Sequence, residues 1–158
     1  MNKFFILILG LIMASCSVSK SVLESKKIVK GNWTLNTISY SESGVFKVTL
    51  LNDSPAECFK GSLWQFIPNN NTGLYTINNS SCTTGTRHFI FTLEDANNNS
   101  SISFLLKPTD EKHKSETNQG FRFSLLKLTQ SEMQLQQKVI LEGKPFNIIM
   151  NFSKIQEK

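Results

Sequence analysis

Apolar and polar residues alternate along most of the chain after residue 30, which is the period of a β-strand with one buried face. The alternating runs are short, and groups of Asn, Gly, Ser and Pro separate them, as is typical of turns. Helical spacing is scarce in this region. The pattern predicts nine strands, at 32–40, 44–51, 62–68, 74–78, 86–94, 101–107, 120–129, 133–142 and 146–155.

Each of these runs has one strongly apolar side. In the fifth strand it consists of Phe89, Phe91 and Leu93, because side chains two residues apart share a face. Consecutive antiparallel strands of this kind can close on themselves and leave no exposed edge. The sequence therefore predicts an all-β fold, an antiparallel up-and-down β-barrel of about eight or nine strands. It occupies residues 31–158, the size of one ordinary domain.

Cys58 and Cys82 flank a predicted β-hairpin. Two strand-like runs, 62–68 and 74–78, surround the turn-forming segment 69–73. Residues equidistant from a hairpin turn face each other, and the midpoint of the two cysteines is residue 70. We expect a disulfide between them, with buried free thiols as the alternative.

The first residues have the features of an export signal. Lys3 precedes an apolar run over residues 4–13, which is too short to span a bilayer. Ala14 and Ser15 then precede Cys16, an order that resembles the lipobox of bacterial lipoproteins. The resemblance implies a lipoprotein signal peptide over 1–15, acylation of Cys16 by palmitate-type chains, and a Ser- and Lys-rich lipidated tether over 16–30. The alternatives are an ordinary signal peptide and a buried core helix.

The residue after Cys16 bears on location. It is serine rather than the aspartate that retains many lipoproteins at the inner membrane, which resembles outer-membrane sorting. Buried acyl methylenes contribute about 0.8 kcal/mol each, so several chains hold a domain on a membrane. We expect a protein that is lipid-anchored in the bacterial cell envelope, at the outer membrane, and whose orientation there stays open.

The net charge of +5 does not indicate a nucleic-acid partner. Basic residues are distributed over the tether and the domain and do not gather beside stacking aromatics. Export also separates the chain from nucleic acid. We expect no nucleic-acid partner and a monomer, and the sequence names no protein partner.

Two segments resemble lipocalins. Gly31 and Trp33 form the Gly-x-Trp pattern that opens the first lipocalin strand, and 58–75 is similar to bacterial lipocalin-like lipoproteins, with Trp-x-Phe-x-Pro-Asn before an Asn/Gly turn. The resemblance implies that Gly31 and Trp33 pack the closed end of a barrel whose mouth accepts a small apolar molecule. Many lipocalins place an arginine on the last strand against this tryptophan. Here the last strand offers Lys154, and Arg122 is the other candidate.

Catalytic chemistry has little support. The chain has two histidines, His88 and His113, and neither stands in a nucleophile or metal-ligand pattern. We expect no catalytic residue, metal or cofactor, and thus not an enzyme.

The aromatic content is a stronger indication, with 12 Phe, 2 Trp and 2 Tyr. An eight-stranded barrel is just wide enough to hold one small ligand or to be filled by side chains. If a pocket exists, the expected ligand-binding residues are Trp64, Phe66, Phe91, Phe104 and Phe123.

Two functions follow. The first is a membrane-tethered lipocalin-like lipoprotein that binds or carries a small hydrophobic molecule in the bacterial envelope. The second is a structural or interaction protein of the envelope, with a filled barrel that docks another protein through its surface or its 108–119 loop.

Overall fold

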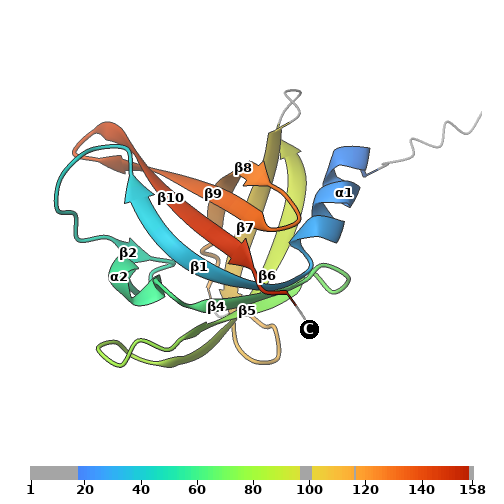
Figure 1. Cartoon of the computed structure of the whole chain (residues 1–158), viewed down its shortest axis with the longest axis horizontal. Coiled ribbons are helices and arrows are strands. Elements are labelled where there is room, and N and C mark those ends of the chain that lie inside the picture. The colour runs from blue at the N-terminus through green and yellow to red at the C-terminus, as the bar shows by residue number, and fades with distance from the viewer. Residues whose placement is uncertain (1–17, 97–100, 116, 157–158) are drawn as a thin grey trace, which may run out of the picture.

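Eight antiparallel strands form one closed barrel in the computed structural model, which describes residues 18–96, 101–115 and 117–156 (Figure 1). Around the barrel their order is β1-β10-β9-β8-β7-β6-β5-β4, so strands that follow one another in sequence are neighbours. This confirms the predicted up-and-down barrel. The barrel strands are β1 (Gly31–Tyr40), β4 (Leu63–Ile67), β5 (Thr72–Ile77), β6 (Gly85–Ala96), β7 (Ser101–Thr109), β8 (Phe121–Leu128), β9 (Glu132–Leu141) and β10 (Lys144–Lys154).

The second predicted strand is wrong, because residues 44–51 do not enter the barrel. They include only β2 (Thr49–Leu50), which pairs with β3 (Ser54–Pro55) in a separate two-stranded sheet. β1 pairs directly with β4, placing Trp33 opposite Trp64, so no position between them remains for another strand. The positive φ of 53° at both Leu51 and Asn52 turns the chain back at once.

Part of the expected tether is a helix. α1 spans Lys20–Val29, and the Ser19 side chain caps it by accepting a hydrogen bond from the Val22 amide at 3.2 Å. Val22 and Val29 are buried, so one side of the helix packs on the domain. The Ser- and Lys-rich composition of the segment does not predict this buried side of the helix. Within the described ranges, no helix has the length and apolar character that a membrane span needs.

α1 lies across one end of the barrel, which is therefore closed (Figure 1). The Trp33 indole donates to the Val29 carbonyl at 2.8 Å, and Lys154 Nζ donates to the Ile28 carbonyl at 2.6 Å. The ammonium of Lys154 also stands 5.2 Å from the centre of the Trp33 ring, a cation–π contact, and burial lowers its pKa. Lys154, rather than Arg122, is the basic partner of Trp33.

Arg122 lies elsewhere on the wall. Its guanidinium binds Glu94 on β6 at 2.7 Å. At the closed end, Gly31 has φ +113°, a conformation that side chains rarely adopt, and its backbone enters β1 beside Lys154.

Gly73 belongs to the predicted turn segment 69–73, but in the structure it lies within β5. It stands opposite Phe89, and a Cβ there would lie 2.4 Å from the Phe89 ring and 2.6 Å from the Gln65 carbonyl oxygen. Only glycine leaves room for that ring to cross the strand.

Candidate functional site

The interior near the closed end is filled by aromatic side chains. Phe91 and Phe104 stack at 5.1 Å between ring centres, and Phe66 contacts each of them edge-on at 5.5 Å. Each of the five residues predicted to line a pocket is at most 2% exposed: Trp64, Phe66, Phe91, Phe104 and Phe123.

Trp64 lies at the centre of this packing. Its ring stacks on Tyr75 at 4.7 Å and meets Phe152 edge-on at 5.5 Å. Its indole nitrogen donates to the Ser62 hydroxyl at 2.8 Å, so no polar atom of the ring is left unsatisfied. The structure therefore brings the five predicted residues together as packed core, and their role in ligand binding stays a prediction.

A cavity of about 580 Å³ opens at the other end of the barrel. Its volume lies within the range of pockets that hold small ligands, roughly 300–1,000 Å³. It lies between the loop that follows β1 and the ends of β8, β9 and β10. Its apolar lining consists of Val45, Phe46, Val48, Leu51, Phe121, Val139, Leu141, Pro145, Phe146 and Ile148.

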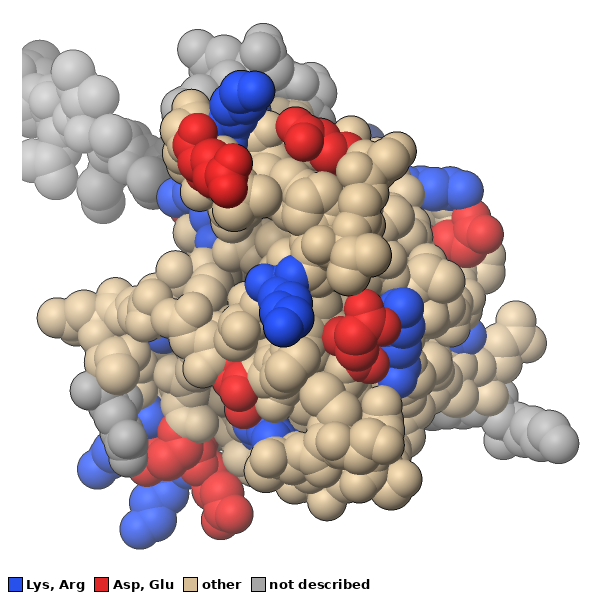
Figure 2. All heavy atoms as spheres, turned by 90° about the vertical axis from the view of Figure 1, so that its left-hand side faces the viewer, with Lys and Arg blue, Asp and Glu red and all other residues tan. Residues whose placement is uncertain are grey.

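Charged residues of both signs surround this mouth. Figure 2 looks at the end of the molecule where α2 (Ala56–Phe59) and the β1–β2 loop lie, and it shows basic and acidic side chains interspersed. Glu42, Lys47, Glu142 and Lys144 line the cavity at its rim. No field of one sign therefore dominates the entrance.

Phe46 holds the β1–β2 loop against the barrel mouth. Its ring lies 4.8 Å from that of Phe146 and 5.4 Å from that of Tyr40. Burial, with a smaller contribution from Glu57, raises the pKa of Tyr40, consistent with a phenol that this loop partly covers. The loop thus forms one wall of the cavity.

A polar cluster lies on the opposite side of the open end. Asp53 accepts a hydrogen bond from the Tyr75 hydroxyl at 2.9 Å and pairs with Arg87 Nε at 3.0 Å. Burial raises the pKa of Tyr75. Arg87 also donates to the carbonyls of Gly85 and Thr83 at 2.8 Å, so its charge is satisfied within the protein.

The Cys58–Cys82 disulfide is present, which confirms that prediction. Its Cα atoms are 5.8 Å apart, and it joins α2 to the loop between β5 and β6. The hairpin register places Trp64 opposite Tyr75 and Phe66 opposite Gly73, symmetric about the predicted turn. The disulfide therefore fastens the segments beside the open end.

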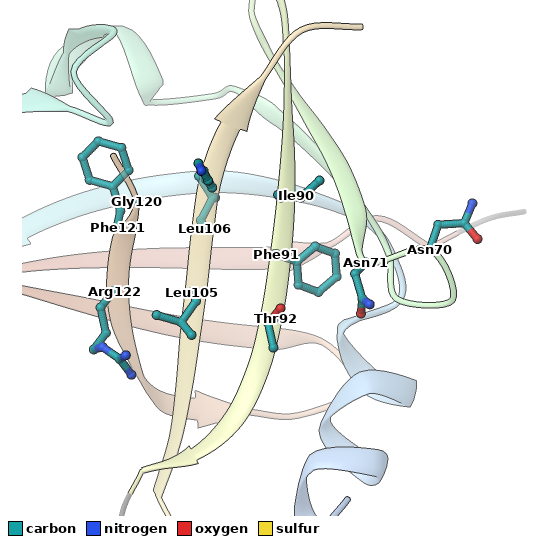
Figure 3. A pocket seen from close by; sticks show the side chains of 11 residues that line it. Asn70, Asn71, Ile90, Phe91, Thr92, Leu105, Leu106, Gly120, Phe121 and Arg122 are labelled. Atoms are coloured by element: carbon teal, nitrogen blue, oxygen red, sulfur yellow. The ribbon is translucent and has the colours of Figure 1, made fainter. Parts of the chain in front are cut away.

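A second hollow, of about 650 Å³, lies on the wall formed by β6, β7 and β8 (Figure 3). Phe91 and Leu106 are buried in the barrel, so the alternating neighbours Ile90, Thr92 and Leu105 face outward. Its lining also includes Arg122, which binds Glu94. We take the mouth cavity as the candidate site because there the apolar lining surrounds the space instead of forming one outer wall.

Sequence reasoning missed the residues of the mouth. Phe46 lies in the segment 44–51 that is predicted to be a strand, and Val139, Phe146 and Ile148 belong to inward strand faces that the alternation does not distinguish from the rest of the core. The available signal for Val139, Phe146 and Ile148 was their position close to the turn at 142–143 that joins β9 to β10.

Metal ligands do not gather in the part of the chain that the structure describes. There, no three residues among His, Cys, Asp and Glu stand close enough to hold an ion. His88 and His113 do meet, with ring centres 6.0 Å apart.

No protein-family model matches the chain, and no curated protein matches it in sequence. Among solved structures, a lipocalin-like protein from Bacteroides uniformis is 15% identical, with a TM-score of 0.49 over 81% of this chain and 99% of that one. An uncharacterized protein from Bacteroides eggerthii is 16% identical, with a TM-score of 0.48 and coverages of 80% and 98%. A bovine odorant-binding protein in complex with a selenium-containing odorant is 8% identical, with a TM-score of 0.45 and coverages of 84% and 74%. The closed, antiparallel up-and-down barrel itself is shown by the strand order of this chain.

Proposed function

We propose that this chain is a binding protein that holds a small hydrophobic molecule in the mouth cavity of its barrel, while lipid on Cys16 tethers it in the bacterial envelope. The observation that carries the binding role is the cavity of about 580 Å³, which is lined mainly by apolar side chains. Transfer of an apolar molecule from water into such a lining contributes about 25 cal/mol per Å² of apolar surface buried.

The packed half of the barrel supports this role because buried side chains close the inner end of the cavity. Leu135 and Met150, the next inward residues toward the closed end, are 2% and 1% exposed. A preformed cavity spares the ligand much of the cost of ordering its own site.

Val139→Trp tests the site. Val139 lines the cavity, so an indole at this position occupies ligand space. We expect the affinity for the fluorescent probe N-phenyl-1-naphthylamine to fall about tenfold or more, equivalent to ~1.4 kcal/mol. Fluorescence titration measures it.

Lys138→Trp is the matched control. Lys138 is exposed and faces outward on the same strand, so the same indole there should leave probe affinity unchanged. Equal affinities for the two variants would contradict the proposed site. A wild-type chain that does not bind the probe would favour the alternative of a docking protein, which the aromatic filling of the closed half also supports.

The position of α1 supports a particular orientation for a lipidated chain. Ser21 and Lys26 of this helix bond to Asp95 and Asn71 near the closed end. Cys16 precedes Lys20 by four residues, which can span at most about 14 Å. The cysteine itself lies outside the described residues. A lipid on it would hold the closed end near the bilayer, with the mouth at the far end.

Cys16→Ser tests the tether. In cells supplied with an alkyne-bearing palmitate analogue, we expect the wild-type chain to be labelled and to sediment with membranes, and the variant to lose both properties. The double variant Cys58→Ser, Cys82→Ser should stay labelled, since it retains Cys16. Labelling that survives Cys16→Ser would disprove the lipidation.

A further inference from the structure

Gln137 contributes a polar side chain to the otherwise apolar depth of the mouth cavity. It lies on β9 directly opposite Ile148 of β10, and residues opposite each other in an antiparallel pair extend to the same side. Ile148 is 2% exposed, as is Leu135 two residues before Gln137 on the same strand. The Gln137 side chain therefore faces the barrel interior, where it lines the cavity.

The polar groups of three aromatic side chains inside the barrel have partners within the protein. The indoles of Trp33 and Trp64 donate to the Val29 carbonyl and the Ser62 hydroxyl, and the Tyr75 hydroxyl donates to Asp53. The carboxamide of Gln137, by contrast, has no hydrogen bond to any side chain or backbone group of the described ranges.

A carboxamide offers two donor hydrogens and two acceptor lone pairs. Water that enters the cavity can satisfy them. A purely apolar ligand that displaced this water would leave them unsatisfied, which costs more than one ordinary hydrogen bond contributes. A ligand with a polar group at this position would avoid the cost.

The depth of Gln137 determines which end of the ligand it meets. Among the lining residues, Gln137 and Ile148 are the furthest from the rim on β9 and β10. Leu141 at the rim is four residues away on β9, about 13 Å at roughly 3.3 Å per residue. Gln137 thus stands at the cavity floor.

The distribution of charged side chains around the cavity favours a neutral ligand group at the floor. Lys47 and Lys144 line the cavity only at its rim, and Arg87 is already paired with Asp53. A buried carboxylate would lack a counter-ion there, and an isolated charge is far more costly to bury than a hydroxyl or a carbonyl.

We propose that Gln137 selects an amphiphilic ligand that enters polar end first, with a neutral carbonyl or hydroxyl group bound to the carboxamide and an apolar body among Phe46, Phe121 and Phe146. This inference rests on the proposed ligand-binding function and specifies its ligand class. Sites built to bond a polar group discriminate strongly against analogues that lack it.

Two probes of nearly the same shape test the role of Gln137. They are 2-acetylnaphthalene and 2-ethylnaphthalene, and the first has a carbonyl group where the second has a methylene group. By calorimetric titration, we expect the wild-type chain to bind the ketone about five- to tenfold more tightly than the hydrocarbon. In Gln137→Leu the ratio should fall to about twofold or less, mainly because the hydrocarbon binds better.

Gln136→Leu is the matched control. Gln136 is the neighbouring residue of the same type and lies opposite Ile149, on the outer face, so the ratio should keep its wild-type value. Gln137→Met, which removes the amide but keeps an unbranched side chain, repeats the test if the leucine variant does not fold.

The outcomes separate the two proposals. Equal affinities of the wild-type chain for both probes, or a ratio that survives in Gln137→Leu or Gln137→Met, would overturn the role of Gln137 and leave the binding function standing. Failure of the wild-type chain to bind either naphthalene or N-phenyl-1-naphthylamine would overturn the binding function itself.

Discussion

Trp64→Ala is expected to lower the free energy of unfolding by about 3–5 kcal/mol, the largest effect we expect from a single substitution in this chain. The Trp64 side chain is 2% exposed and contacts the rings of Phe59, Phe66, Tyr75 and Phe89 as well as Phe152. Alanine would leave a large void between them. It would also leave the Ser62 hydroxyl without the indole hydrogen bond.

Urea denaturation, followed by circular dichroism, measures this loss. Gln65→Ala is the matched control, because Gln65 is the next residue of β4 and faces outward, and we expect it to cost less than about 1 kcal/mol.

Trp64→Ala also tests whether Trp64 is a core residue or a ligand-binding residue. As a core residue it should leave the probe affinity of the folded protein within about twofold of wild type, since Trp64 does not line the mouth cavity. A large loss of affinity with little loss of stability would instead support the ligand-binding role that the sequence predicted.

Removing the disulfide is the second large effect. The double variant Cys58→Ser, Cys82→Ser is expected to lower the free energy of unfolding by about 3 kcal/mol, because the bond closes a loop across a sequence separation of 24 and so restricts the unfolded chain. The double change avoids leaving a single reactive thiol.

Denaturation of the oxidised and the reduced wild-type chain gives the matched comparison. The double variant should resemble the reduced protein, and reducing agent should not change the variant itself. A double variant as stable as the oxidised wild-type chain would show that the packing around α2 and the β5–β6 loop compensates for the lost restriction of the unfolded chain.

The barrel could be predicted because its signals are local. Alternation such as Phe89, Phe91, Leu93 defines a strand and its buried face by itself, and the Asn-rich turn at 69–71 sets the register of its hairpin. The disulfide followed from the same symmetry. These features depend on residues that lie close together along the chain.

Predictions failed where a segment depends on distant partners. The 44–51 run alternates like a strand, but the pairing of β1 with β4 leaves it outside the barrel. The helix at Lys20–Val29 is stabilised because Val22 and Val29 pack on the end of the barrel. A segment with so few apolar residues does not predict this contact.

The eight barrel strands, their apolar faces, the order of the meander and the disulfide could be predicted from the sequence alone, because period-two alternation and turn chemistry are properties of neighbouring residues. Which part of the barrel is filled and which part holds a cavity depends on how the strands come together in three dimensions. The alternation marks every inward side chain in the same way, whether it packs in the core or lines a cavity. The volume left between these side chains depends on which rings contact one another across the barrel. Near the closed end Trp64, Phe66 and Phe91 fill that space, and toward the mouth Phe146 and Ile148 surround a cavity with Gln137 at its floor.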